Sequence, residues 1–196
     1  MAVRKLKYIV TTTRRSNPRT RSLAKELALS LPHALKINRG KARLDELVEY
    51  AKGLGAANLV IVGRGLQGNP GRIEIVNFCS SEETLYRLIL KLRGVRLARE
   101  YGARPRPPPE IAIVAQAQPP SLELGHELAA TLNLPLLETD DPSAVKGVYS
   151  SIILVEPLTG GLLAVKFVSP EGEPKGPRLL VEKYAIGGWP RCSKRG

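Results

Sequence analysis

Hydrophobic and polar positions along the first third of the chain predict a strand followed by a helix. Residues 7–14 (KYIVTTTR) are β-branched and aromatic before they turn polar, which is typical of a strand. Asn17-Pro18 then supplies the residue types of a helix N-cap and a first helical position. Leucines recur at helical spacing from residue 23 to residue 31, so we expect a helix over residues 17–31.

The same patterns define the other elements of the first half. Strands are predicted over residues 34–38, 58–63 and 72–78. A second helix follows Arg39-Gly40-Lys41 and ends near Gly53. Ser80 and Glu83 have the spacing of a capping box, which predicts a third helix from residue 80 to residue 101. The expected order is therefore βαβαββα.

A proline-rich stretch, GARPRPPPE, divides the chain, and the pattern begins again after it. The elements expected there are a strand at 110–116, a helix at 121–133, a short strand at 134–140, a hairpin of 152–158 with 162–168, and a last strand at 177–186. We thus divide the chain into an N-terminal half (1–101), a connector (102–110), a C-terminal half (111–186) and a loose tail (187–196).

The restart has the form of an internal repeat. Residues 23–28 (LAKELA) align with residues 124–129 (LGHELA), and a proline followed by a short strand comes after each segment. The expected fold class is therefore α/β, with two duplicated halves built from mixed sheets and helices.

Length and composition exclude several classes of protein. The 196 residues contain no apolar run near the ~20 residues of a membrane span, and the N-terminus lacks the apolar core of a signal peptide. Cys79 and Cys192 lie far apart, without the spacing of a metal site or a disulfide framework. We expect a reduced, cytoplasmic protein with no membrane partner.

Charge is distributed unevenly between the two halves. The net charge is +12, with a pI near 10.0. Residues 1–109 hold 22 of the 30 Lys and Arg but only 8 of the 18 Asp and Glu, so the whole excess lies in this half. Such asymmetry predicts a polyanionic partner on one face.

No motif predicts catalysis. Residues 63–68 (GRGLQG) match the spacing of a dinucleotide-binding loop, but a strand follows them instead of the required helix, so a hairpin loop is expected. His33 and His126 stand alone, and no nucleophile or metal-ligand set accompanies them. We expect no enzyme activity, no metal and no cofactor.

The strongest functional signal is a group of arginines around the start of the first expected helix: Arg14, Arg15, Arg19 and Arg21. Cations are unfavourable at the positive end of a helix dipole, and residues 1–25 contain no acid to balance them. A phosphate would be bound there by the helix N–H groups and by the arginine forks. We therefore interpret these arginines as phosphate ligands.

Two further pairs of cations repeat this arrangement. Arg39 and Lys41 precede the second helix, and Arg64 and Arg72 flank the glycine-rich loop. In a wound α/β layout these loops meet at one edge of the sheet. Several phosphate sites side by side indicate nucleic acid, and an aromatic content of only 5% favours the backbone of structured RNA over base stacking.

Four segments carry a resemblance to a known family. They are TTTRRSNPRTRSLAKEL (11–27), KINRGKARLDELVEYA (36–51), NLVIVGRGLQGNPGRIEI (58–75) and GPRLLVEKYAI (176–186). Together they resemble the Brix domain, and the compact chain looks like its single-domain archaeal form.

The resemblance implies a function and a fold. Eukaryotic members of the family are ribosome-assembly factors that bind rRNA precursors, among them a member of the small-subunit processome. Each half would be similar to the anticodon-binding domain of class II aminoacyl-tRNA synthetases. The RNA-binding role would fall on Arg14, Arg15, Arg19, Arg21, Arg39 and Lys41, with rRNA precursor and other assembly proteins as partners. The alternatives are a structural ribosomal protein and a tRNA- or nucleotide-acting enzyme.

Overall fold

The computed structural model describes residues 6–78 and 84–190. Its helices are α1 (Pro18–Ser30), α2 (Leu44–Gly53) and α3 (Ser121–Leu132), with 3₁₀ turns η1 (Leu66–Gly68), η2 (Ala98–Tyr101), η3 (Pro142–Val145) and η4 (Thr159–Gly161). Its strands are β1 (Tyr8–Thr12), β2 (Ala34–Lys36), β3 (Asn58–Arg64), β4 (Pro70–Asn77), β5 (Thr84–Arg96), β6 (Ala112–Ala115), β7 (Leu136–Glu138), β8 (Ile152–Pro157), β9 (Leu163–Val168) and β10 (Pro174–Pro190).

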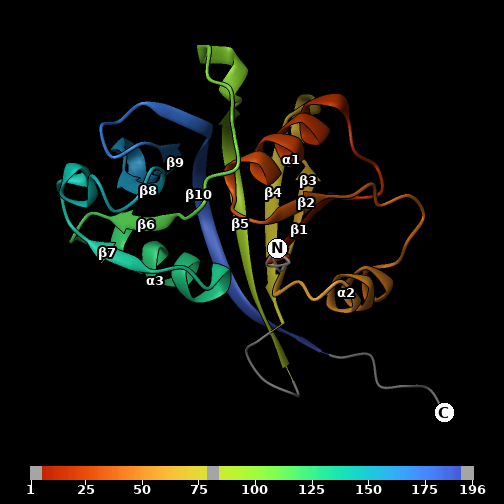
Figure 1. Ribbon diagram of the computed structural model, residues 1–196. Coiled ribbons are helices and arrows are strands. Elements are labelled where there is room, and N and C mark those ends of the chain that lie inside the picture. The colour runs from red at the N-terminus through yellow and green to blue at the C-terminus, as the bar shows by residue number, and fades with distance from the viewer. Residues whose placement is uncertain (1–5, 79–83, 191–196) are drawn as a thin grey trace.

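The strands of the described residues form one mixed sheet in the order β2-β1-β3-β4-β5-β10-β9-β8-β6-β7. In the first half, β1 pairs in parallel with β2 and β3, and the antiparallel strands β4 and β5 continue from β3 to the centre. In the second half, β6 pairs in parallel with β7 and β8, and the antiparallel strands β9 and β10 continue from β8 to the centre. β5 and β10 join the halves as an antiparallel pair. Figure 1 shows these two long strands crossing the middle of the molecule between the two sets of shorter strands. The expected α/β class is confirmed.

One face of the sheet carries a core that both halves share. Leu23 and Leu27 of α1, its C-cap residue Leu31, and the leucines of α3 (Leu124, Leu128, Leu132) belong to a single buried cluster. Strand residues from both halves complete it, including Val60, Leu90, Ile153 and Leu179. Burying apolar surface at about 25 cal/mol per Å² makes this shared core the main source of stability. The two halves therefore fold against each other and not as separate cores.

Polar contacts fix α3 of the second half to the first half. The last carbonyl groups of a helix have no partner within the helix. Here the Tyr8 hydroxyl donates to the Leu132 carbonyl at 2.8 Å, and the side-chain amides of Asn58 and Asn77 donate to the Thr131 carbonyl. Strands β1, β3 and β4 thus cap a helix that comes from the other half of the sequence.

The predicted third helix is wrong. The described residues of that stretch, from 84 on, form strand β5 and then the short turn η2, while the proposed cap at residues 80–83 lies outside the described residues. Leu88, Leu90 and Leu92 alternate into the shared core, and β4 and β10 satisfy the backbone on both sides. Pairing on two sides outweighs the local helical signal, because it satisfies every backbone group of a central strand.

The other predicted elements are present, with one difference at the C-terminus. β10 continues through residues 187–190, which pair with residues 84–87 of β5. The expected loose tail therefore does not begin at residue 187, and residues 191–196 lie outside the described part of the chain.

Candidate nucleic-acid interface

The predicted site residues surround one edge of the sheet, which we call the basic edge. It consists of the loops that follow β1, β2 and β3 together with the start of β4: residues 13–17, 37–43 and 64–72. β1 is parallel to both β2 and β3, so their carboxyl ends meet at the same side. The amide of Thr13 donates to the Val62 carbonyl at 2.9 Å and holds the loop that follows β1 against β3.

Arg14 and Arg39 converge on a single acceptor. The Arg14 Nε–H donates to the Ala42 carbonyl at 3.4 Å, and the Arg39 Nε–H donates to the same oxygen at 3.2 Å. Two guanidinium groups from different loops therefore lie side by side. Burial lowers the pKa of Arg39, and the charge of Arg14 lowers it further. An arginine stays protonated despite such a shift, so the pair holds two positive charges close together.

Arg72, at the start of β4, is anchored by a buried acid. Glu74 is only 4% exposed, and its carboxylate pairs with Arg72 at 2.7 Å and with Arg87 at 2.6 Å. Its charge also acts on Arg39. One buried carboxylate shared by two arginines leaves the local charge positive, and it fixes the direction of both forks.

The start of α1 is already capped. Asn17 accepts the Thr20 N–H on its side chain at 2.8 Å, and its carbonyl accepts the Arg21 N–H at 3.0 Å. Pro18 has no N–H to offer. Little of this helix N-terminus is thus left for an anion, and the side chains must provide most of any phosphate contact.

Arg19 differs from the other three arginines of the opening group. Its guanidinium donates to the Val95 carbonyl at 3.1 Å and to the Glu100 carboxylate at 3.0 Å. The sequence pattern does not indicate Glu100 as a partner of Arg19, because it lies 81 residues further along the chain. Arg19 therefore ties α1 to the end of β5. The remaining predicted residues expose their side chains to solvent: Arg14, Arg15, Arg21, Lys41, Arg64 and Arg72.

The glycine-rich loop is a hairpin tip, as its sequence context predicts. β3 and β4 pair antiparallel on either side of it. A Cβ on Gly71 would lie 2.5 Å from the Gly65 Cα, so both glycines are needed for the two chains to pass this closely. The tip lies near the start of α1, since a Cβ on Gly68 would be 4.0 Å from the Asn17 side-chain nitrogen. The glycines thus serve the hairpin turn.

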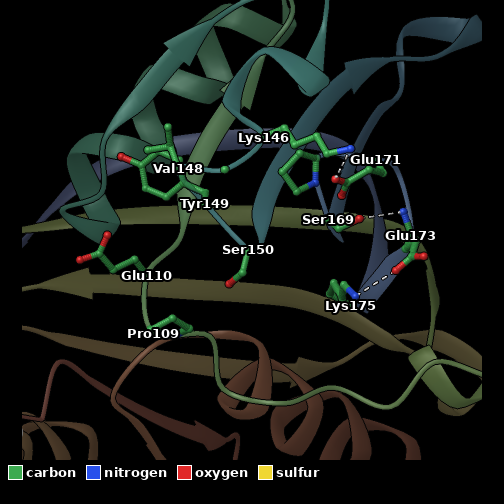
Figure 2. Close-up of a pocket in the computed structure, with 12 residues that line it drawn as sticks. Pro109, Glu110, Lys146, Val148, Tyr149, Ser150, Ser169, Glu171, Glu173 and Lys175 are labelled. Atoms are coloured by element: carbon green, nitrogen blue, oxygen red, sulfur yellow. Dashed lines mark hydrogen bonds and ion pairs between the residues drawn. The ribbon is translucent and has the colours of Figure 1, made fainter.

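The corresponding loops of the second half, which follow β6, β7 and β8, are not cationic, because residues 116–120, 139–145 and 158–162 contain no Lys or Arg. A cavity of about 630 Å³ opens at the other ends of β6 and β8, and Figure 2 shows that each of its lysines faces a glutamate. Lys146 pairs with Glu171 at 3.3 Å and Lys175 with Glu173 at 3.1 Å. This cavity therefore offers no net positive charge to a phosphate.

Two other features bear on function. Within residues 6–78 and 84–190, no group of three or more His, Cys, Asp or Glu side chains is arranged to hold a metal ion. None of the helices in this part of the chain combines the length and the apolar character that crossing a bilayer requires.

Comparisons with known proteins identify the family. No family model matches the chain. A probable Brix domain-containing ribosomal biogenesis protein of Aeropyrum pernix is 30% identical over 178 residues, which cover 90% of this chain and 95% of the relative. A protein of the same description from Pyrobaculum aerophilum is 28% identical over 90% of this chain and 94% of its own length.

Solved structures agree in fold. A crystal structure of a probable ribosomal biogenesis protein from Aeropyrum pernix K1 matches with a TM-score of 0.69 and 25% identity, covering 91% of this chain and 96% of that one. An archaeal Imp4-like protein, Mil, matches with a TM-score of 0.61 over 92% of this chain and 99% of its own, at 20% identity, which speaks to the fold alone. The sequence and structural matches together show that the chain belongs to the Brix-domain family.

Proposed function

We propose that the protein is an RNA-binding ribosome biogenesis factor that acts in the cytoplasm, where its basic edge binds the phosphate backbone of an rRNA precursor. The observation that carries this proposal is the gathering of cations from three separate loops at one edge of the sheet, where Arg14 and Arg39 share the Ala42 carbonyl. The relatives from Aeropyrum and Pyrobaculum support it, since both are described as probable ribosomal biogenesis proteins.

The exposed cations of the basic edge are the proposed phosphate ligands. Arg14, Arg15, Arg21, Lys41 and Arg64 have free side-chain donors that point toward solvent. Arginine binds two phosphate oxygens at once, which suits a repeating phosphodiester chain. Arg19, Arg39 and Arg72 are held by protein acceptors, so they contribute charge and shape the surface. Such binding requires no catalytic group, and we propose a non-enzymatic role.

We also propose that the two halves arose by duplication and that each corresponds to an anticodon-binding-like unit. The matching strand orders support this idea. So does a shared detail of the two helices: the Ser30 hydroxyl in α1 and the Thr131 hydroxyl in α3 each donate to the carbonyl four residues earlier, that of Glu26 and that of Glu127. These residues occupy the same positions in the sequence repeat.

Sedimentation of cell extracts tests the proposed function directly. A biogenesis factor should migrate with precursor particles and be absent from mature subunits, whereas a structural ribosomal protein should remain with the mature subunits. Crosslinking in cells, followed by sequencing of the attached RNA, should recover precursor segments. If mature subunits carry the protein in stoichiometric amounts, the assignment to biogenesis is wrong.

A further inference from the structure

Among residues 6–78 and 84–190, the face of the sheet opposite α1 and α3 has apolar clusters over it only at its two sides. On one side, α2 packs over β1, β3 and β4 through the cluster that contains Ile9, Leu59 and Val76. On the other side, the η3 segment packs over β6, β8 and β9 through the cluster of Val114, Val145 and Ile152. Neither cluster includes a residue of β5 or β10. The two central strands thus expose their second face between these two covers.

This exposed face of the central strands is cationic. Residues that alternate with the buried leucines and valines of a strand point to the opposite side of the sheet. Five of the cationic side chains on this face form what we call the central strip: Lys91 and Arg96 of β5, Arg178 and Lys183 of β10, and Lys166 of β9. Their adjacent residues Leu90, Leu92, Leu97, Leu179 and Val165 lie in the shared core, and Tyr184, next to Lys183, packs against it. A register shift between Val181 and Lys183 brings Lys183 to the outer face.

The register of the strands places these cations directly opposite one another. Arg178 is the cross-strand partner of Arg96 on one side and of Lys166 on the other. Lys183 is likewise opposite Lys91, which is opposite Arg72 of the basic edge. Like charges in directly opposed positions destabilise a sheet. Four such pairs in one surface indicate that an anion normally lies over it.

Acidic side chains neutralise only part of the strip. Lys91 pairs with Glu182 at 3.2 Å, and Lys166 pairs with Glu156. Within the described residues, Arg96, Arg178 and Lys183 have no ion-pair partner. Three of the five cations therefore remain available to an external anion.

A cavity of about 250 Å³ opens at the end of the strip that contains Arg96 and Arg178. Arg96, Lys166 and Arg178 line it together with Tyr101. The Arg96 guanidinium lies 5.2 Å from the centre of the Tyr101 ring, and the Arg178 Nε is buried without a hydrogen-bond partner among the described residues. In contrast to the lysines of the cavity in Figure 2, these two arginines form no ion pair with a glutamate of the described part of the chain. A phosphate oxygen would satisfy the buried donor.

We propose that the central strip binds the phosphate backbone of the same RNA as the basic edge, so that the second half of the chain contributes Arg178 and Lys183 to RNA binding. The proposal rests on the proposed RNA-binding function and extends it. The two surfaces are continuous, because Arg72 of the basic edge lies opposite Lys91 of the strip. An RNA strand would leave the basic edge near Arg72 and cross β5, β10 and β9.

Three variants test the proposal. The strip variant carries Arg96→Gln, Arg178→Gln and Lys183→Gln. The control variant carries Lys25→Gln, Arg106→Gln and Lys146→Gln, which remove the same charge from exposed positions off the strip. The edge variant carries Arg14→Ala, Arg15→Ala and Arg21→Ala. Each is titrated with structured fragments of rRNA precursor over a range of salt concentrations, and the thermal midpoint is recorded for each.

We expect the strip variant to bind at least about tenfold more weakly than the control variant, with a salt slope smaller by about two to three. Failure of the parent protein to bind the fragments overturns both the proposed function and this proposal. If the parent protein binds, the edge variant binds more weakly, and the strip variant binds as tightly as the control variant, this proposal alone is overturned.

Crosslinking of RNA to the unsubstituted protein gives a second result that needs no variant to fold. Ultraviolet crosslinks located by peptide mass spectrometry should fall in β5 and β10 as well as in the loops of the basic edge. Crosslinks confined to the loops would contradict the proposal.

Discussion

Arginines that are close in sequence have different tasks in this protein. Arg19 binds the Val95 carbonyl and Glu100, whereas Arg21 donates to the nearby Ser16 carbonyl at 3.1 Å and remains exposed. The absence of acids in residues 1–25 correctly indicates that no local carboxylate pairs with these arginines. It does not reveal a partner 81 residues away, because that contact depends on the sheet that brings β5 beside α1.

Replacement of Arg19 should lower stability. We expect Arg19→Ala to reduce the free energy of unfolding by about 1 kcal/mol, since it removes a partly exposed ion pair and a hydrogen bond to a backbone carbonyl. Arg21→Ala is the matched control and should leave the thermal midpoint unchanged or slightly higher, because a cation leaves a helix N-terminus. Thermal unfolding of both variants measures the difference.

The ion pair of Arg19 with Glu100 predicts that the free energy of unfolding depends on pH. Desolvation raises the pKa of Glu100, but the hydrogen bond from Arg19 and that from the Leu97 amide lower it more, so it lies below the ordinary 4.5. A carboxylate with a lowered pKa stabilises the fold above that ordinary value and loses this effect as the pH falls through the lowered pKa. The deficit of Arg19→Ala should therefore shrink in acid. A deficit that stays constant from neutral to strongly acidic pH would contradict the ion pair.

At the scale of elements, the hairpin of β3 and β4 shows what a glycine pattern can mean. The spacing of residues 63–68 matches that of a nucleotide-binding loop, but a strand pattern follows them, and this pattern correctly predicts a hairpin. Gly65 and Gly71 allow the two chains to pass closely at its mouth. This contact positions Arg64 and the tip beside the start of α1.

Gly71→Ala should distort this hairpin. A methyl group there would lie 2.5 Å from the Gly65 Cα, so the backbone must shift, at a cost of about 1–3 kcal/mol. We also expect weaker RNA binding, because the loop would move away from the basic edge. Gly53→Ala is the control: a Cβ there meets nothing within 4 Å, and alanine favours a helix. Equal midpoints for the two variants would show that the close approach is unimportant.

β5 marks the limit of prediction from local pattern. A capping-box sequence precedes this stretch, and the leucines within it fit both helical and alternating spacing. Periodicity alone therefore does not decide between helix and strand. β4 and β10 decide it, and β10 lies almost a hundred residues away. The error concealed the central strip, since Lys91 and Arg96 share a face only in a strand whose register shifts between Leu92 and Gly94.

For the whole molecule, the sequence predicts the α/β class and the clustering of the basic loops, because both follow from parallel strands joined by helices. The continuous sheet and the capping of α3 by Tyr8, Asn58 and Asn77 depend on contacts between the halves. The net charge of the second half gave no sign that it presents cations. Strand register assembles Arg178 and Lys183 with cations of the first half, and net charge does not report register.

A salt titration of RNA binding tests the central claim most directly. If about six phosphates are neutralised, the affinity of the protein for structured rRNA precursor fragments should fall about a thousandfold between about 50 and 200 mM salt. The variant with Arg14→Ala, Arg15→Ala and Arg21→Ala should show a smaller slope. An affinity that hardly changes with salt, or a slope that these three substitutions leave intact, would contradict binding through the phosphates at the basic edge.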